Sequence, residues 1–235
     1  LVIANEAAMT AITDAGLAPR DIAGLAAWPN PAHPVARNYP GYDRLDVPHM
    51  AQVIPVENLR WFCQTEIPAA GVVSLVQAAA TALASGACNY ALVFRSWHHP
   101  PGGRYHQIRG KTAGGTQQFT LSYGHGVGGA VQAVGYRRYL HKYGAAREEI
   151  AAYVLTTNRN AQRNDYAVWK GRTITLVEYM NARPIAYPMC IFDNDMPVDG
   201  VACVVMTTED RAGDTPHPGG YISGMAVSPY NMAGN

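Results

Sequence analysis

The sequence predicts a layered α/β fold in which helices cover a largely parallel sheet. Helical and apolar extended segments alternate along the 235 residues, and this order is typical of proteins with parallel strands. Apolar residues make up 48% of the chain, which is ample for a packed core. The 23 glycines and 16 prolines indicate many tight connections and argue against a plain helical bundle.

The first part of the chain predicts a helix, a strand and a second helix. Residues 4–15 carry small and apolar side chains at helical spacing, and Gly16 follows as a C-cap. Residues 21–28 read as an apolar strand. The next forty residues are rich in Pro, His, Tyr and Asn and predict a long surface excursion without regular structure. Residues 70–85 then form a strong amphipathic helix that ends at Gly86.

The continuous apolar run over residues 90–94 predicts a buried strand directly after this helix. The elements expected after it are a loop over 97–122, helices over about 126–143, 147–164 and 175–181, and strands over 201–208 and 220–227. The helix over 175–181 begins at a threonine cap.

Charge excludes several classes of function. The 18 Lys and Arg residues against 17 Asp and Glu give a formal charge of +1, so the composition indicates no nucleic-acid-binding arm. Charged residues are only 15% of the chain, compared with about 25% in typical soluble domains. We therefore expect another subunit to cover part of the surface, most simply in a homodimer.

The sequence predicts no membrane span, because no stretch approaches the roughly 18 to 20 apolar residues that a span requires. The first ten residues have no basic region and no cleavage pattern, so we expect no secretory signal. The four cysteines are Cys63, Cys88, Cys190 and Cys203, and no CxxC or CxxH pair occurs. We expect free thiols in a reducing cytoplasm.

The glycine-rich segment over residues 124–129 matches the G-x-G-x-x-G pattern of dinucleotide-binding proteins. That fingerprint needs a buried strand before it and an acidic residue about 20 positions later, at the end of a second strand. Residues 119–123 make a poor strand, and Glu148 and Glu149 lie at a helix start. We favour a close backbone approach where a helix enters a packed site.

Tyr123 and His125 lie at the entry of that same helix. A phenol and an imidazole can both transfer protons, and a helix N-terminus favours a negatively charged partner. The two side chains are therefore candidates for the rim of a substrate pocket. The alternative is that both are half-buried and bonded to the backbone.

The sequence predicts no metal site. The adjacent His98 and His99 have no carboxylate at ligand spacing, and adjacent histidines on a loop rarely face one ion. Asp193, Asp195 and Asp199 could mimic a calcium loop, but the glycine at loop position six and the glutamate at position twelve are missing. A turn that leads into a strand is the expected structure there.

Several segments, in their order and spacing, resemble the thiolase superfamily, and the resemblance covers nearly the whole chain. They include Gly71 at the start of a helix, the strand over 90–94, the stretch 182–188 and the Pro-Val-Asp-Gly motif over 197–200. Within the superfamily the chain is similar to the sterol-carrier-protein-type thiolases. It is most similar to the actinobacterial "lipid-transfer protein" branch, the thiolase-like aldolases of steroid side-chain degradation, on residues 94–105 and 122–126.

The chain departs from a working thiolase at the nucleophile. In that family a cysteine stands three residues before the helix-opening glycine, and here the position is Pro68. Because proline cannot be acylated, an acyl-enzyme is not expected. Cys63 would need a rearranged loop to substitute. The aldolase branch also lacks the cysteine, so the resemblance implies an aldolase.

The resemblance implies a layered α-β-α fold and mostly the N-terminal half of the family fold. We interpret residues 1–235 as that domain, with a long loop insertion over about 97–200, and the C-terminal half as absent. The main acid and base of the family fall in that missing half. We interpret the sequence as a fragment, as a partially determined sequence or as a protein that has lost its second half.

The implied reaction is retro-aldol cleavage of a β-hydroxyacyl-CoA to a ketone and a shorter acyl-CoA such as propionyl-CoA. Arg95 and Arg104 are candidates for binding CoA phosphates, or they are solvated, and Pro68 lies at the acyl site. No cofactor is expected in this chain, since the CoA thioester is the substrate. Related aldolases imply a small OB-fold partner that often carries zinc.

Two other functions stay open. One is a thiolase-type acyltransferase that uses a cysteine not evident from the sequence. The other is a non-catalytic lipid- or acyl-CoA-binding subunit whose partner holds the chemistry. The identity of the products distinguishes these classes.

Overall fold

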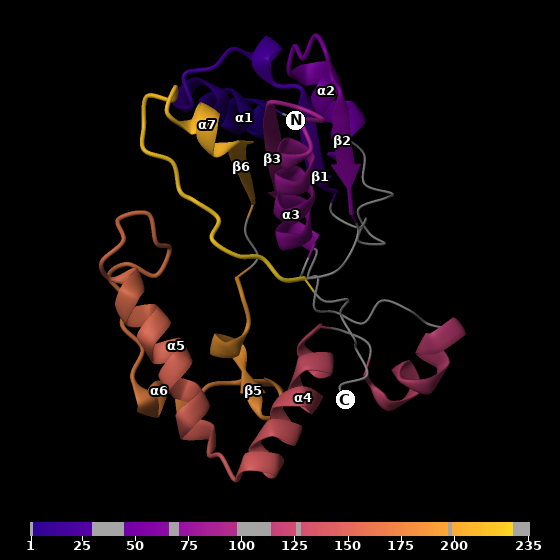
Figure 1. The fold of residues 1–235 in the computed structure, drawn as a ribbon. Coiled ribbons are helices and arrows are strands. Elements are labelled where there is room, and N and C mark those ends of the chain that lie inside the picture. Colours follow the sequence, from indigo (N-terminus) through magenta and orange to yellow (C-terminus); the bar gives the residue numbers. More distant parts are fainter. Residues whose placement is uncertain are drawn as a thin grey trace. The chain divides into compact units, whose positions relative to one another are not determined.

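The computed structural model describes residues 2–29, 45–65, 71–97, 114–125, 128–196 and 199–227. The chain divides into two compact units (Figure 1). The first unit comprises Leu1–Gly103 and Val198–Asn231, and the second comprises Arg104–Pro197 and the last four residues. The second unit is thus inserted between two parts of the first, over nearly the range that the sequence analysis describes as a long loop insertion.

The first unit is built on a four-stranded sheet in the order β2-β1-β3-β6. β1 lies in the middle and pairs in parallel with both β2 and β3, whereas β6 pairs with β3 in antiparallel register. The predicted largely parallel sheet is therefore confirmed, with one antiparallel edge strand. The strands are β1 (Gly24–Trp28), β2 (Trp61–Gln64), β3 (Tyr90–Trp97) and β6 (Gly200–Thr207).

Helices cover both faces of this sheet, which gives the α-β-α layering. Side chains alternate along β1, so Leu25 packs in the core under α1 and α2, and Ala26 packs in the core under α3. The same alternation separates Leu92 from Val93 on β3. The helices are α1 (Val2–Asp14), α2 (Val47–Val53) and α3 (Gly71–Ala84).

The helix ends follow the predicted glycine caps. Gly16 and Gly86 have φ values of 72° and 73°, in the left-handed region where a side chain is strained. Gly16 also packs against Pro216, since a methyl group built on it would lie 2.8 Å from the proline Cδ. Both C-caps are confirmed.

Two elements were missed in the predicted excursion after β1. Asp46 caps α2 by accepting a hydrogen bond from the His49 amide at 3.1 Å. β2 is an edge strand whose Phe62 is 66% exposed, so its apolar pattern is too weak to stand out from the surrounding polar sequence. The prediction of a stretch without regular structure was therefore wrong for the residues of α2 and β2. Residues 30–44 and 66–70 of the same stretch lie outside the described residues.

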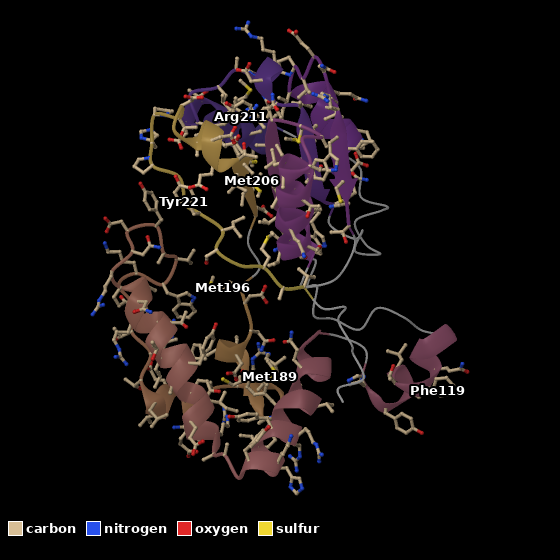
Figure 2. The ribbon with its side chains drawn as sticks, in the orientation of Figure 1. Phe119, Met189, Met196, Met206, Arg211 and Tyr221 are labelled. Carbon is tan, nitrogen blue, oxygen red and sulfur yellow. The ribbon has the colours of Figure 1, made fainter. Side chains whose placement is uncertain are left out.

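The second unit has its own small core, in which Ala151, Tyr179 and Cys190 are buried. Its hairpin carries Met189, which is buried and labelled in Figure 2. The helix over 175–181 is confirmed, with Thr175 and Glu178 forming a reciprocal capping box. The elements are α4 (Gly128–Tyr143), α5 (Arg147–Ala161), α6 (Leu176–Met180), β4 (Pro184–Ala186) and β5 (Met189–Cys190).

The last predicted strand was wrong. After β6 the chain forms the short helix α7 (Glu209–Ala212) and then runs without regular structure through residues 218–227. Tyr221 and Ile222 are exposed. No strand pairs with them in the described part of the chain. Among the residues described here, no helix is both long enough and apolar enough to cross a membrane.

Candidate functional site

Trp28 and Gly71 pack together at the carboxyl end of the parallel strands. Trp28 is the last residue of β1 and is 6% exposed, and Gly71 opens α3. A methyl group built on Gly71 would lie 2.3 Å from both Cδ1 and Nε1 of the Trp28 indole. Only glycine therefore fits at this contact. The carboxyl ends of parallel strands are where α/β proteins bind ligands, which makes this contact part of a candidate site.

Arg95 lies against two tryptophans at the same end of the sheet. Its guanidinium carbon is 4.4 Å from the Trp28 ring centroid and 5.1 Å from that of Trp97. The two indoles are nearly parallel, with centroids 5.9 Å apart and an interplanar angle of 9°. Arg95 is half-buried in this cation–π contact. Trp28 and Trp97 were missed in the sequence analysis, although each ends one of two neighbouring parallel strands.

Tyr123 and His125 lie on a tight turn of the second unit. The backbone amides of Tyr123 and His125 both donate to the Thr120 carbonyl at 3.1 Å, and Gly124 between them has a φ of 77°. Both residues therefore belong to the same turn. The Tyr123 side chain is 86% exposed, whereas His125 is partly covered. A phenol with that exposure is available to a ligand.

The remaining predicted site residues, Pro68 and Arg104, lie outside the described residues. Arg95 belongs to the first unit, and Tyr123 and His125 belong to the second. The structure thus brings Tyr123 and His125 onto one turn and places Arg95 on a separate cluster with Trp28.

No protein-family model matches the chain. Among curated proteins, the chain is 28% identical over 96% of its length to a steroid side-chain-cleaving aldolase from Thermomonospora curvata, of which it covers 56%. It is 27% identical over 91% of its length to a 17-hydroxy-3-oxo-4-pregnene-20-carboxyl-CoA lyase from Mycobacterium tuberculosis, of which it covers 54%. A solved Ltp2-ChsH2(DUF35) aldolase matches 92% of the chain with a TM-score of 0.78 and 28% identity.

The chain has a thiolase-like fold. The acetyl-CoA acetyltransferase of Syntrophomonas wolfei shares the fold with a TM-score of 0.58, at 17% identity over 91% of the chain and 59% of its own. The predicted resemblance to the thiolase superfamily, and to its steroid aldolase branch, is therefore confirmed. The thiolase-like chain spans about half the length of the curated relatives that it matches.

The cysteines of this thiolase-like chain sit in places that disfavour nucleophilic chemistry. Burial raises the pKa of the Cys63 and Cys190 thiols. It also raises the pKa of the Cys88 thiol, which the charge of Arg60 lowers in part. Cys63 lies on β2, opposite Ala26 of β1. Because the thiolate is the nucleophile, raised pKa values keep these groups protonated and unreactive at neutral pH.

Cys203 gives a direct test of this protection. Burial raises its pKa from 9.0 to about 11, so at pH 8 it carries about 100-fold less thiolate than an ordinary cysteine. We expect iodoacetamide at pH 8 to label Cys203 far more slowly in the native chain than in urea, as followed by peptide mass spectrometry. Equal labelling rates in the two states would contradict the placement of this thiol.

Asp193 organises the core of the second unit. Its Oδ1 accepts a hydrogen bond from the Tyr179 hydroxyl at 2.7 Å, and its Oδ2 accepts one from the Cys190 amide at 2.6 Å. Burial and the Asp193 carboxylate raise the pKa of Tyr179 well above its usual range. Arg147 donates to the Tyr179 and Met180 carbonyls at 3.2 and 3.1 Å. The predicted turn at this position is confirmed.

Within the described ranges, no group of three His, Cys, Asp or Glu residues is placed to hold a metal ion. His49 hydrogen-bonds through Nδ1 to Asp46 at 2.6 Å. His98 and His99, which the sequence analysis considers as ligands, lie outside the described residues.

Proposed function

We propose that the protein that contains this thiolase-like chain cleaves a β-hydroxyacyl-CoA by a retro-aldol reaction. The similarity of nearly the whole chain to a steroid side-chain-cleaving aldolase and to a pregnene-carboxyl-CoA lyase carries this proposal. The aldolase whose fold matches with a TM-score of 0.78 supports it. The substrate class is a CoA thioester with a tertiary hydroxyl on its β-carbon, attached to a steroid or a similar ring.

The reaction balances without an external oxidant or a covalent intermediate. A base removes the hydroxyl proton, the oxygen forms the ketone, and the bond between the α- and β-carbons breaks. Its electron pair passes to the α-carbon and the thioester as an enolate, which is then protonated to give the shorter acyl-CoA. Preorganised donors at the enolate oxygen supply most of the acceleration in reactions of this kind.

The residues of this chain favour the aldolase over the acyltransferase. Pro68 stands where an acyl-accepting cysteine would be needed, and the raised pKa values of Cys63 and Cys88 favour the protonated thiols. We propose Tyr123 and His125 as pocket residues, and Arg95 and Arg104 as candidates for the CoA phosphates. No cofactor beyond the CoA thioester enters the proposed step.

We also propose that the active form includes further subunits. The matched solved structure is a two-component aldolase by its name, which supports a second subunit beside this chain. The low content of charged residues, 15%, supports a covered surface and a homodimer. A small OB-fold subunit with zinc is the partner that we propose to test first.

The proposed function is tested by product identity. The chain, alone and co-expressed with an OB-fold subunit of the ChsH2 type, is incubated with a 17-hydroxy-pregnene-20-carboxyl-CoA. Liquid chromatography and mass spectrometry should detect the 17-ketone and propionyl-CoA in equal amounts. The analogue without the 17-hydroxyl is the control and should stay intact. Free CoA with an uncleaved acid, or transfer of the intact acyl group to added isotope-labelled CoA, would contradict the proposal.

Substitution of His125 tests the pocket. If His125 moves or holds a proton during cleavage, His125→Ala should lower kcat by about 100-fold, and Tyr123→Phe should lower it less. The control is Tyr166→Phe, because Tyr166 is 96% exposed in the same unit. A His125→Ala variant with unchanged kcat would remove His125 from the pocket.

A further inference from the structure

The two units carry opposite charge, although the chain as a whole is nearly neutral. The first unit contains six Lys and Arg against 11 Asp and Glu, a formal charge of −5. The second unit contains 12 Lys and Arg against six Asp and Glu, a formal charge of +6. Opposite charges on two surfaces steer them together and favour one orientation of contact. A basic surface on one copy of the chain is therefore complementary to an acidic surface on another copy.

The second unit presents an ordered loop after α5, over residues 162–173, which we call the Tyr166 loop. The Gln162 side chain holds its backbone in place. Its Nε2 donates to the Trp169 carbonyl at 3.0 Å, and its Oε1 accepts from the Gly171 amide at 2.8 Å. Because the loop is already held in one conformation, a partner that binds it does not have to order it first.

The most exposed side chains of the Tyr166 loop are apolar or aromatic, and most of its charged residues are basic. Tyr166 is 96% exposed and Val168 is 71% exposed. Three exposed cations accompany them, namely Arg163, Lys170 and Arg172. Asp165, which pairs with Lys170, is the only acidic residue of the loop. Tyrosine and arginine are enriched among the residues that dominate binding at protein interfaces, so the loop is suited to an acidic partner surface.

The first unit contains a pocket of about 480 Å³ between the ends of α1, α3 and β6, the helix α7 and the segment after α7. Met206 and Tyr221, both labelled in Figure 2, lie on its wall. Other apolar side chains of the wall are Leu17, Leu83 and Ile222. Pockets that enclose small ligands start at about 300 Å³, so this pocket has room for an aromatic side chain.

Carboxylates lie at the mouth of this pocket. Asp14 and Glu209 both line the pocket and are exposed, and Asp210 follows on α7. Cationic groups offset this charge only in part, since Arg211 pairs with Asp210 at 3.0 Å and His217 lies 3.6 Å from Asp14. The pocket therefore combines an apolar wall with an acidic mouth, which is the complement of the Tyr166 loop.

We propose that the Tyr166 loop of one copy of the chain docks in this pocket of another copy. Tyr166 enters the apolar part of the pocket, and Arg163 and Arg172 face its acidic mouth. The contact joins two different surfaces of identical chains, so it is heterologous, and it does not depend on the proposed reaction. One tyrosine buries about 150–250 Å², so the contact is small and belongs to the weak, salt-sensitive class.

Site-specific photocross-linking tests the contact. The photoreactive residue p-benzoylphenylalanine replaces Tyr166 in the full chain. Equal amounts of unlabelled and heavy-isotope-labelled protein are then mixed and irradiated, and the cross-linked peptides are identified by mass spectrometry. We expect cross-links from the loop to the peptides that contain Met206 and Tyr221, with one isotope on each side, because such mixed pairs form only between copies.

The matched control carries the same photoreactive residue at position 153, because Tyr153 is 74% exposed on α5 of the same unit. Its mixed-isotope cross-links to the pocket should stay at the background level. Equal yields from positions 153 and 166 would overturn the proposal. So would cross-links from position 166 that join the pocket only within one isotope, or that miss the pocket.

Charge reversal tests the acidic mouth. In the photoreactive chain, R163E/R172E should lower the yield of mixed cross-links by about tenfold, because like charges then face each other. D14K/E209K in the other copy should lower it similarly, and the two variants mixed together should restore it. All four positions are exposed, so both variants should fold, which circular dichroism checks. Folded variants that show no restoration on mixing would contradict the proposed pairing of loop and pocket.

Discussion

Replacing Gly71 with alanine is expected to destabilise the first unit by about 3 kcal/mol, at the upper end of the cost of overpacking a core. The added methyl group would lie 2.3 Å from two atoms of the Trp28 indole, so the indole or the start of α3 must move. Urea denaturation followed by tryptophan fluorescence measures the loss, because Trp28, Trp61 and Trp97 all belong to this unit.

Two further variants distinguish a steric conflict with the Trp28 indole from a general cost of replacing a helical glycine. Gly135 lies in the middle of α4 with no atom within 4 Å of a methyl group built on it, so Gly135→Ala should be neutral or stabilising by up to about 1 kcal/mol. In a Trp28→Leu background, Gly71→Ala should cost much less than in the wild type. An equal cost in both backgrounds would show that the indole is not the obstacle.

Replacing Asp193 with alanine is expected to destabilise the second unit by about 3 kcal/mol. The substitution leaves the buried Tyr179 hydroxyl and the Cys190 amide without their acceptor, and each unsatisfied buried donor costs on the order of 1–3 kcal/mol. Hydrogen–deuterium exchange over α5 and α6 measures the effect, since these helices pack around the same core.

Asp165→Ala is the control for this prediction. Asp165 is 83% exposed and pairs with Lys170 on the surface of the same unit, and such pairs contribute about 0–1 kcal/mol. Exchange in Asp165→Ala should match the wild type. Equal protection of α5 and α6 in Asp193→Ala and the wild type would show that the aspartate is not needed for the core.

The sequence predicted the elements that have a strong local pattern. The helix from Gly71 and the strand from Tyr90 combine an apolar face or run with a glycine cap, so local preference and tertiary packing agree. The edge strand β2 and the hairpin of β4 and β5 are short and depend on their partners for stability. For that reason the local sequence pattern of these strands was too weak to predict them.

The residues at the candidate site were predictable only in part. Arg95, Tyr123 and His125 were proposed from the sequence because their side chains carry chemistry, and their roles stay predictions. The stacked Trp28 and Trp97 were missed, because they meet only once two strands that are far apart in the sequence are paired.

The insertion of the second unit has a consequence for the order of folding. β3 and β6 pair from Tyr90 and Thr207 to Trp97 and Gly200, so the ladder closes a loop that contains all residues from 98 to 199. For a disordered loop of this length, closure costs about 2 kcal/mol more than for a loop of ten residues. A second unit that collapses first and brings its ends together lowers this entropic barrier. The β3–β6 ladder should therefore be among the last parts of the sheet to gain protection during refolding.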